Sequence, residues 1–130
     1  MATIEEWLAN SSDEVRSIAL HARGAVLEEL PGARELVDLG DGLLAFGPSN
    51  VGQGIRMRDL VVGLIPHARW VNAQFASAVE LPDPDGLLEG TGKRIRHVKL
   101  RSLADVDRPG FRRLLREAWR HAGHAGGAAR

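Results

Sequence analysis

The fold is decided by residues 35–47, which read ELVDLGDGLLAFG. Two short apolar runs, 35–39 and 43–47, lie on either side of the turn Gly40-Asp41-Gly42. An Asp-Gly pair between apolar runs is typical of a β-hairpin, because glycine readily adopts the left-handed backbone that tight turns need. The stretch therefore predicts two antiparallel strands, and the other elements are placed around them.

Amphipathic helices are predicted ahead of this hairpin. Thr3 and Glu6 have the spacing of a capping box, in which each side chain accepts a hydrogen bond from the backbone of the other residue. Ser11 and Glu14 repeat this spacing, and apolar residues then recur at intervals of three and four as far as Leu30. A proline and a glycine follow Leu30 and predict the end of the second helix.

Further strands and a last helix are predicted after the hairpin. The strands are expected at residues 55–66, 69–75 and 94–100, with one helical turn at 76–81 and a connector at 102–107 that is capped at Asp107. Polar and apolar residues alternate in 69–75, which is typical of a half-buried strand. The last helix follows from the spacing of its apolar residues, Phe111, Leu114, Leu115, Ala118 and Trp119.

This order of elements predicts an α+β fold. Strands that are grouped between helices, and joined by hairpin turns, favour a mostly antiparallel sheet of about five strands. The N-terminal and C-terminal helices then pack on one face of the sheet, where their apolar stripes are buried. We expect residues 1–120 to form a single domain and residues 121–130 to form a flexible C-terminal tail of low complexity.

Composition excludes several classes of protein. The 130 residues suit one domain, and the absence of cysteine excludes disulfides, thiolate metal sites and cysteine nucleophiles. No apolar run approaches the roughly 18 residues of a membrane helix, and the start MATIEEWL lacks the order of a signal peptide. We therefore expect a cytoplasmic protein with no membrane partner.

Charge is unevenly distributed along the chain. Residues 1–41 hold nine acidic and three basic residues, a net charge of −6, and the remainder carries +6 because the total is zero. Such a polarity either serves binding, or the two parts of the chain pair with each other or lie on solvated faces. We expect the second interpretation, in which the charges pair or face water.

The most distinctive stretch is ELPDPDGLLEGTGKRIRHVKLRSL, residues 80–103. It resembles the C-terminal motif of the YdhG-like domains (domain of unknown function 1801), and the wider resemblance covers residues 3–119. The resemblance implies a helix, a sheet and a closing helix, and one member of that family is described as an intracellular frataxin-like iron chaperone. The chain departs from many relatives where it reads DLVVGLIPHARWVNAQF instead of an aromatic-rich stretch, and it has no tyrosine.

Iron delivery is the most specific function that the resemblance implies. Iron favours carboxylate oxygens, and a chaperone must hold it weakly. Glu28, Glu29 and Asp41 are the predicted metal ligands, whereas Glu35 and Asp38 would face opposite sides of a regular strand. No cofactor is expected to be required, and iron would be bound weakly.

A basic segment offers an alternative site for an anion. Its predicted ligands are Lys93, Arg94, Arg96 and Lys99. The preceding GTGK lacks the spacing of a phosphate-binding loop, and a strand rather than a helix is predicted after it. Nucleic acid is not expected as a partner, because the net charge is zero and no aromatic residues are interleaved with the basic ones.

Trp70, Asn72 and Gln74 form a third candidate site. They share the polar side of the strand at 69–75, where a tryptophan is typical of a pocket or a protein interface. No arrangement of catalytic residues is predicted. The sequence therefore indicates a small cytoplasmic binding protein, with frataxin-like iron delivery as one interpretation. The alternatives are a domain that binds a small molecule or an anion, and a protein-interaction module that forms a homodimer.

Overall fold

The computed structural model describes residues 2–48 and 59–123. The helices are α1 (Ile4–Trp7), α2 (Asp13–Glu29), α3 (Leu103–Asp107) and α4 (Pro109–His121), and a 3-10 turn, η2, spans Ala78–Glu80. The strands are β1 (Arg34–Asp38), β2 (Leu43–Gly47), β3 (Val62–Pro66), β4 (Val71–Phe75) and β5 (Arg96–Leu100). This order confirms the predicted α+β class.

The strands form one five-stranded sheet in the order β1-β2-β3-β4-β5, and every neighbouring pair is antiparallel. The first hairpin begins the sheet as predicted, and its turn contains Gly42 at a φ of +65°. One cross-strand row shows how the register continues: Leu36, Ala45, Gly63, Gln74 and His97 are paired in succession from β1 to β5. Because paired residues share a face, this row lies on a single side of the sheet.

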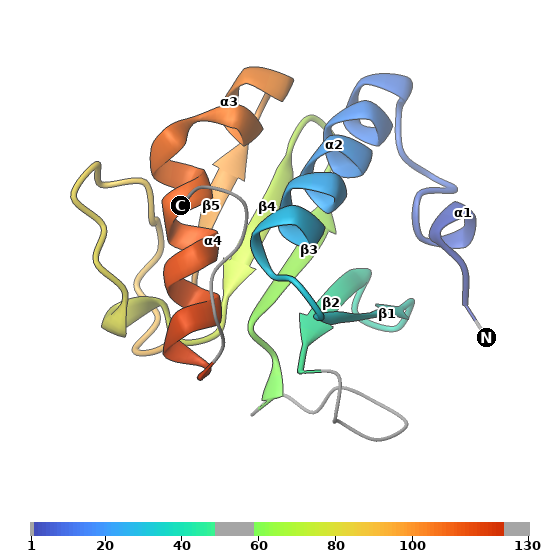
Figure 1. Cartoon of the computed structure of the whole chain (residues 1–130). Coiled ribbons are helices and arrows are strands. Elements are labelled where there is room, and N and C mark those ends of the chain that lie inside the picture. Colours follow the sequence, from blue (N-terminus) through green and yellow to red (C-terminus); the bar gives the residue numbers. More distant parts are fainter. Residues whose placement is uncertain (1, 49–58, 124–130) are drawn as a thin grey trace.

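The helices cover one face of the sheet and leave the other face without a helix (Figure 1). The main core lies under α2 and α4, where Phe46, Leu64 and Leu100 meet the helices and Phe75 packs edge to face on Phe111, with ring centroids 6.4 Å apart. Trp7 and Trp119 are buried there, as predicted. Burial of each large apolar side chain stabilises the fold by about 1.5–3 kcal/mol, so this layer supplies most of the driving force.

A smaller apolar cluster lies on the other face and contains Leu43, Ala45 and Leu60. Leu43 folds over Gly63, where a Cβ atom would collide with its side chain. The helix-free face is therefore apolar over β2 and β3.

The segment before β5, which contains the distinctive motif, covers the end of the sheet. The carboxylate of Asp83 accepts hydrogen bonds from the backbone N–H groups of Leu87 and Leu88, both at 2.9 Å, and both leucines pack on the main core. Glu89 forms a β-bridge with His97. These contacts give the motif a structural role.

The glycines of the sequence GTGK in that segment are required by its backbone geometry. Gly90 has a φ of +112°, and a Cβ at Gly92 would collide with the carbonyl oxygen of Ile95. The glycines thus permit a tight turn, and β5 follows the turn, as predicted. No helix N-terminus is available there to hold a phosphate.

Several predicted boundaries are wrong. Ser12 rather than Ser11 caps α2, because its hydroxyl accepts from the N–H of Val15. One strand was predicted over residues 55–66, but β3 begins only at Val62, so Asp59 and Leu60 do not belong to it. Residues 55–58 lie outside the described residues.

The C-terminal part also differs from the prediction. The connector predicted at 102–107 is the helix α3, which Ser102 caps. Asp107 is the last residue of α3 and does not cap α4, whose N-cap position is Arg108. The tail predicted at 121–130 begins too early, because His121 still belongs to α4; residues 124–130 lie outside the described residues. No helix in the described ranges is long and apolar enough to cross a membrane.

Candidate functional site

The candidate site lies on the helix-free face, over β4 and β5. Asn72 pairs with Lys99 and Gln74 pairs with His97 across these strands. Both pairs alternate with buried residues such as Ala73 and Val98, so their side chains point away from the main core. The predicted set of Trp70, Asn72 and Gln74 is therefore brought together with a cation from β5.

Trp70 is held in place by its neighbours. Its indole Nε1–H donates to Oδ1 of Asn72 at 2.9 Å, and Nδ2 of Asn72 lies 3.1 Å from Nε2 of His67. The His67 and Trp70 rings are stacked with centroids 5.2 Å apart and planes 19° apart. A backbone hydrogen bond of 2.8 Å from the N–H of His67 to the carbonyl of Trp70 closes the turn that brings these rings together.

A cation completes this group, which we call the Trp70 cluster: His67, Trp70, Asn72 and Lys99. The ammonium Nζ of Lys99 lies 4.7 Å from the centroid of the Trp70 ring, within the range of a cation–π interaction. No carboxylate pairs with Lys99 within residues 2–48 and 59–123. The ammonium group thus retains donors for a negatively charged group of a ligand or partner.

The other predicted anion ligands are not brought to this place. Lys93 and Arg94 are exposed in the turn before β5. Arg96 pairs with Phe75, so it lies on the helix-covered side, and its Nε–H donates to the carbonyl of Gly92 at 3.0 Å. Only Lys99 of the four basic residues joins the Trp70 cluster.

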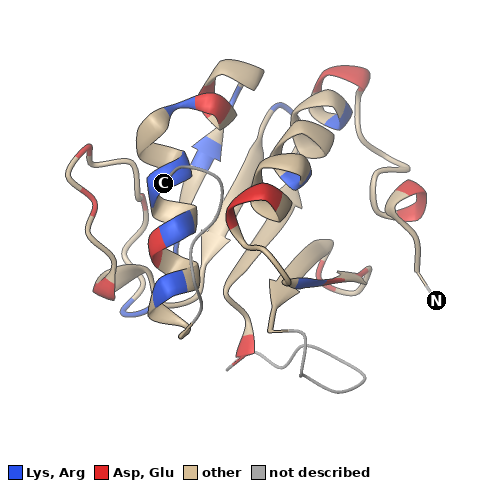
Figure 2. Ribbon diagram, in the orientation of Figure 1, with Lys and Arg blue, Asp and Glu red and all other residues tan. Residues whose placement is uncertain are grey.

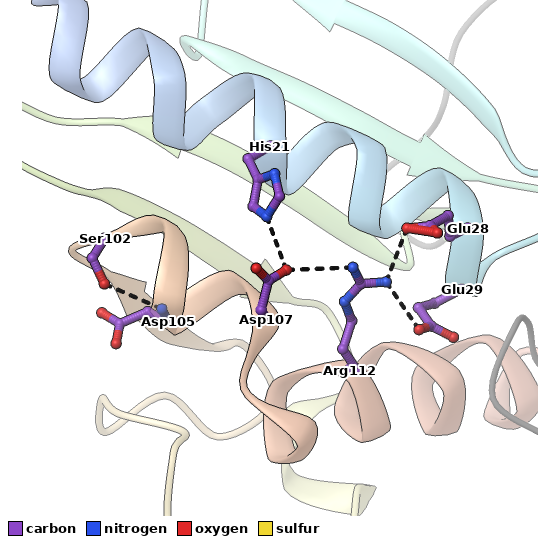
Figure 3. A network of polar contacts seen from close by, with 7 residues as sticks. All are labelled: His21, Glu28, Glu29, Ser102, Asp105, Asp107 and Arg112. Carbon is purple, nitrogen blue, oxygen red and sulfur yellow. Dashed lines mark hydrogen bonds and ion pairs between the residues drawn. The ribbon is translucent and has the colours of Figure 1, made fainter.

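Two of the predicted metal ligands are bound by arginine. Oε1 of Glu28 and Oε2 of Glu29 each lie 3.1 Å from Nη1 of Arg112, as Figure 3 shows. Arg116 approaches the other oxygen of Glu29 at 3.2 Å. Glu29 is 2% exposed, so its carboxylate is enclosed between two guanidinium groups.

The same network extends along α2 and α3 (Figure 3). His21 Nε2 lies 2.8 Å from Oδ1 of Asp107, and Arg112 Nη2 lies 3.6 Å from that oxygen. The hydrogen bond from His21, assisted by Arg112, lowers the pKa of Asp107. Partial burial disfavours the charged form of Arg112, but hydrogen bonds to Glu28 and Glu29 outweigh this effect and raise its pKa.

This network accounts for part of the uneven charge of the sequence. Acidic residues at the end of α2 face basic residues of α4 (Figure 2). Pairing between the acidic and basic parts of the chain, one of the two outcomes left open by the sequence, is thus observed for Glu28 and Glu29.

Asp41, the third predicted metal ligand, lies elsewhere. It borders a shallow hollow of about 400 Å³ between the β1–β2 turn, Trp7 and His67. No group of three or more His, Asp and Glu side chains is placed to hold a metal ion within the described ranges. Iron binding therefore stays a prediction from the resemblance.

A second hollow, of about 290 Å³, lies at the end of α4. Asp59, Ser77 and His121 border it, and His121 Nε2 lies 2.8 Å from Oε2 of Glu80. This pair joins η2 to α4.

Sequence reasoning missed His67 in the candidate site. Alternation identifies residues that share the face of one strand, but His67 reaches Trp70 through the turn before β4. The adjacent Pro66 was a signal for that bend, although not for its geometry. Comparison with family models, with curated proteins and with solved structures finds no match to this chain.

Proposed function

We propose that this protein is a non-catalytic binding protein of the YdhG-like family, which binds an acidic partner on the helix-free face of its sheet. The observation that carries the proposal is the Trp70 cluster, where Lys99 lies over a tryptophan that Asn72 holds in place. The resemblance of residues 80–103 supports the family, and the absence of cysteine supports a cytoplasmic location.

The shape of the face favours a macromolecular partner over a small molecule. The two hollows described above lie at the ends of the strands and do not contain Trp70, Asn72 or Lys99. A face with a fixed aromatic ring and an unneutralised cation, both outside these two hollows, suits a protein surface, where tryptophan and charge complementarity contribute strongly to binding. The partner's matching group is a carboxylate or another anion.

The experiment is a titration of the ¹⁵N-labelled protein with a tetraglutamate peptide, and separately with inorganic phosphate, followed by NMR. We expect the largest shifts at the Trp70 indole N–H and at the amides of Gln74, His97 and Lys99. Lys99→Ala should weaken peptide binding about fivefold to tenfold, which corresponds to the loss of roughly 1.0–1.4 kcal/mol, just below the range for a hydrogen bond to a charged group because Lys99 stays in contact with water.

Lys93→Ala is the matched control, because it removes the same charge from an exposed position outside the cluster. It should leave peptide binding unchanged. Equal weakening by both variants would indicate attraction to overall charge only, and shifts confined to residues 90–95 would place the site in the turn. Either result contradicts the proposal.

A further inference from the structure

Three segments of the chain meet at the end of the sheet where Asp41 lies. Leu44 pairs with Leu64 across β2 and β3, so the turn before β2 and the turn after β3 lie at the same end of the sheet. The end of α1 is tied to this place, because the indole Nε1–H of Trp7 donates to the carbonyl of Gly42 at 3.1 Å. The three segments border the hollow of about 400 Å³, and pockets for small ligands measure roughly 300–1,000 Å³.

The lining of this hollow is in large part apolar. Trp7 belongs to the main core and is 6% exposed, whereas Ile65 packs on the smaller cluster of the helix-free face. Pro66 and Ala68 complete the apolar part of the lining. Because the hydrogen bond to Gly42 holds the indole of Trp7, an apolar ligand group meets a surface that is already ordered, which lowers the entropic cost of binding.

Of the described residues that line the hollow, Asp41 alone carries a carboxylate. Its backbone N–H donates to Asp38, but its carboxylate forms no hydrogen bond or ion pair with any residue in 2–48 and 59–123. Asn10 and Ser11, at the end of α1, add an amide and a hydroxyl to the lining. Apolar walls with a few polar groups and one unpaired charge are typical of a site for a small ligand of the opposite charge.

His67, which also lines the hollow, argues against a metal ion as that ligand. The indole N–H of Trp70 can only donate, so the atom of Asn72 that accepts from it at 2.9 Å is the oxygen Oδ1. Nδ2 of Asn72 therefore donates to Nε2 of His67, 3.1 Å away, and the ring hydrogen of His67 lies on Nδ1. Neither ring nitrogen has a free lone pair for a metal while this contact holds, which leaves Asp41 as a single ligand.

We propose that this hollow binds a small organic amine, whose ammonium group pairs with Asp41 and whose apolar body lies against Trp7 and Pro66. An ammonium group carries one positive charge and several N–H donors. One carboxylate balances that charge, and the side-chain oxygens of Asn10 and Ser11 can accept from the remaining donors.

This site is distinct from the surface proposed for an acidic partner. Trp70, Asn72 and Lys99 do not line the hollow, and His67 is the one residue of the Trp70 cluster that does. Because His67 stacks on Trp70, a ligand that contacts His67 should also shift the indole N–H signal of Trp70. Binding of the tetraglutamate peptide depends on Lys99 and not on Asp41, so the two proposals fail independently.

The test is a titration of the ¹⁵N-labelled full chain with 2-phenylethylamine at constant pH, followed by NMR. We expect saturable binding with a Kd of about 1 mM, and the largest shifts at the indole N–H of Trp7 and at the amides of Asp41, Gly42 and Ala68. 2-Phenylethanol has a similar body without the charge, and it should bind at least about fivefold more weakly.

Asp41→Asn removes the charge from the hollow and should weaken binding of 2-phenylethylamine at least about fivefold. Asp59→Asn is the matched control, because it makes the same change at a carboxylate that borders the other hollow, and it should leave binding unchanged. No saturation by about 20 mM amine, equal weakening by the two variants, equal binding of the alcohol, or largest shifts away from this hollow would each overturn the proposal.

Discussion

Glu28 and Glu29 provide a direct comparison of an exposed and a buried ion pair. Both carboxylates lie 3.1 Å from the same atom, Nη1 of Arg112, but their side chains are 58% and 3% exposed. We predict that Glu28→Gln changes the free energy of unfolding by no more than about 0.5 kcal/mol, as is typical of an exposed pair. Glu29→Gln should cost about 3 kcal/mol, because it breaks a buried pair.

The estimate for Glu29 lies at the low end of the range for buried pairs. Arg112 and Arg116 remain 21% and 17% exposed, so water can solvate them in part after the carboxylate is lost. For a chain of this length, the unfolding entropy is about 0.27 kcal/mol per kelvin, and a loss of 3 kcal/mol lowers Tm by about 11 °C. The corresponding change for Glu28→Gln is about 2 °C or less.

Thermal and urea unfolding followed by far-UV circular dichroism measures both variants, and an unchanged urea m-value shows that the same surface is exposed. High salt should remove the small effect of Glu28→Gln and preserve most of the effect of Glu29→Gln, since buried pairs are screened less. Equal losses in the two variants, or a loss below about 1 kcal/mol for Glu29→Gln, would refute the role assigned to burial.

Two further predictions concern the backbone conformation at two glycines and the loss of stability at low pH. Gly24→Ala should stabilise the protein by about 0.5–1 kcal/mol, because Gly24 lies inside α2 with no atom within 4 Å of an added Cβ. Gly32→Ala likewise lowers the conformational entropy of the unfolded chain, but it should destabilise the folded protein by about 1 kcal/mol. The reason is that φ at Gly32 is +84°, which is unfavourable for alanine. Urea unfolding measures the change in the free energy of unfolding for each variant, and stabilisation by both would contradict the role given to the positive φ of Gly32. For Asp107, a folded-state pKa below the ordinary value of 3.8 means that its contribution is present above that value and is lost as pH falls through the lowered pKa. Asp107→Asn should therefore lose less stability than the wild type between about pH 4 and pH 2, and equal losses would contradict the prediction.

Local signals in the sequence were sufficient for most of the fold. The Asp-Gly turn placed the first hairpin, and the capping box at Thr3 and Glu6 placed α1. α3 was missed because five residues are too few to show a helical period. The long apolar run before Pro66 hid the start of β3, since periodicity does not locate the end of a continuously apolar strand.

The candidate site was predicted only in part, because its residues come from different elements. Alternation within one strand grouped Trp70, Asn72 and Gln74, but Lys99 joins them through a strand pairing that sequence alone does not specify. The same limit applies to Glu29, which was predicted to be a metal ligand. Its partner Arg112 is 83 positions away in the chain.

That separation has a consequence for the protein while it is being synthesised. The strands can pair as they leave the ribosome, because each neighbour in the sheet is also the next strand in the chain. α4 is made much later than α2, by roughly 4–17 seconds at ordinary rates of translation. Until then, the sheet surface that receives Phe111 and Trp119 is exposed, and Glu29 has no guanidinium partner from α4. The nascent chain is therefore expected to need protection from aggregation until its last helix emerges.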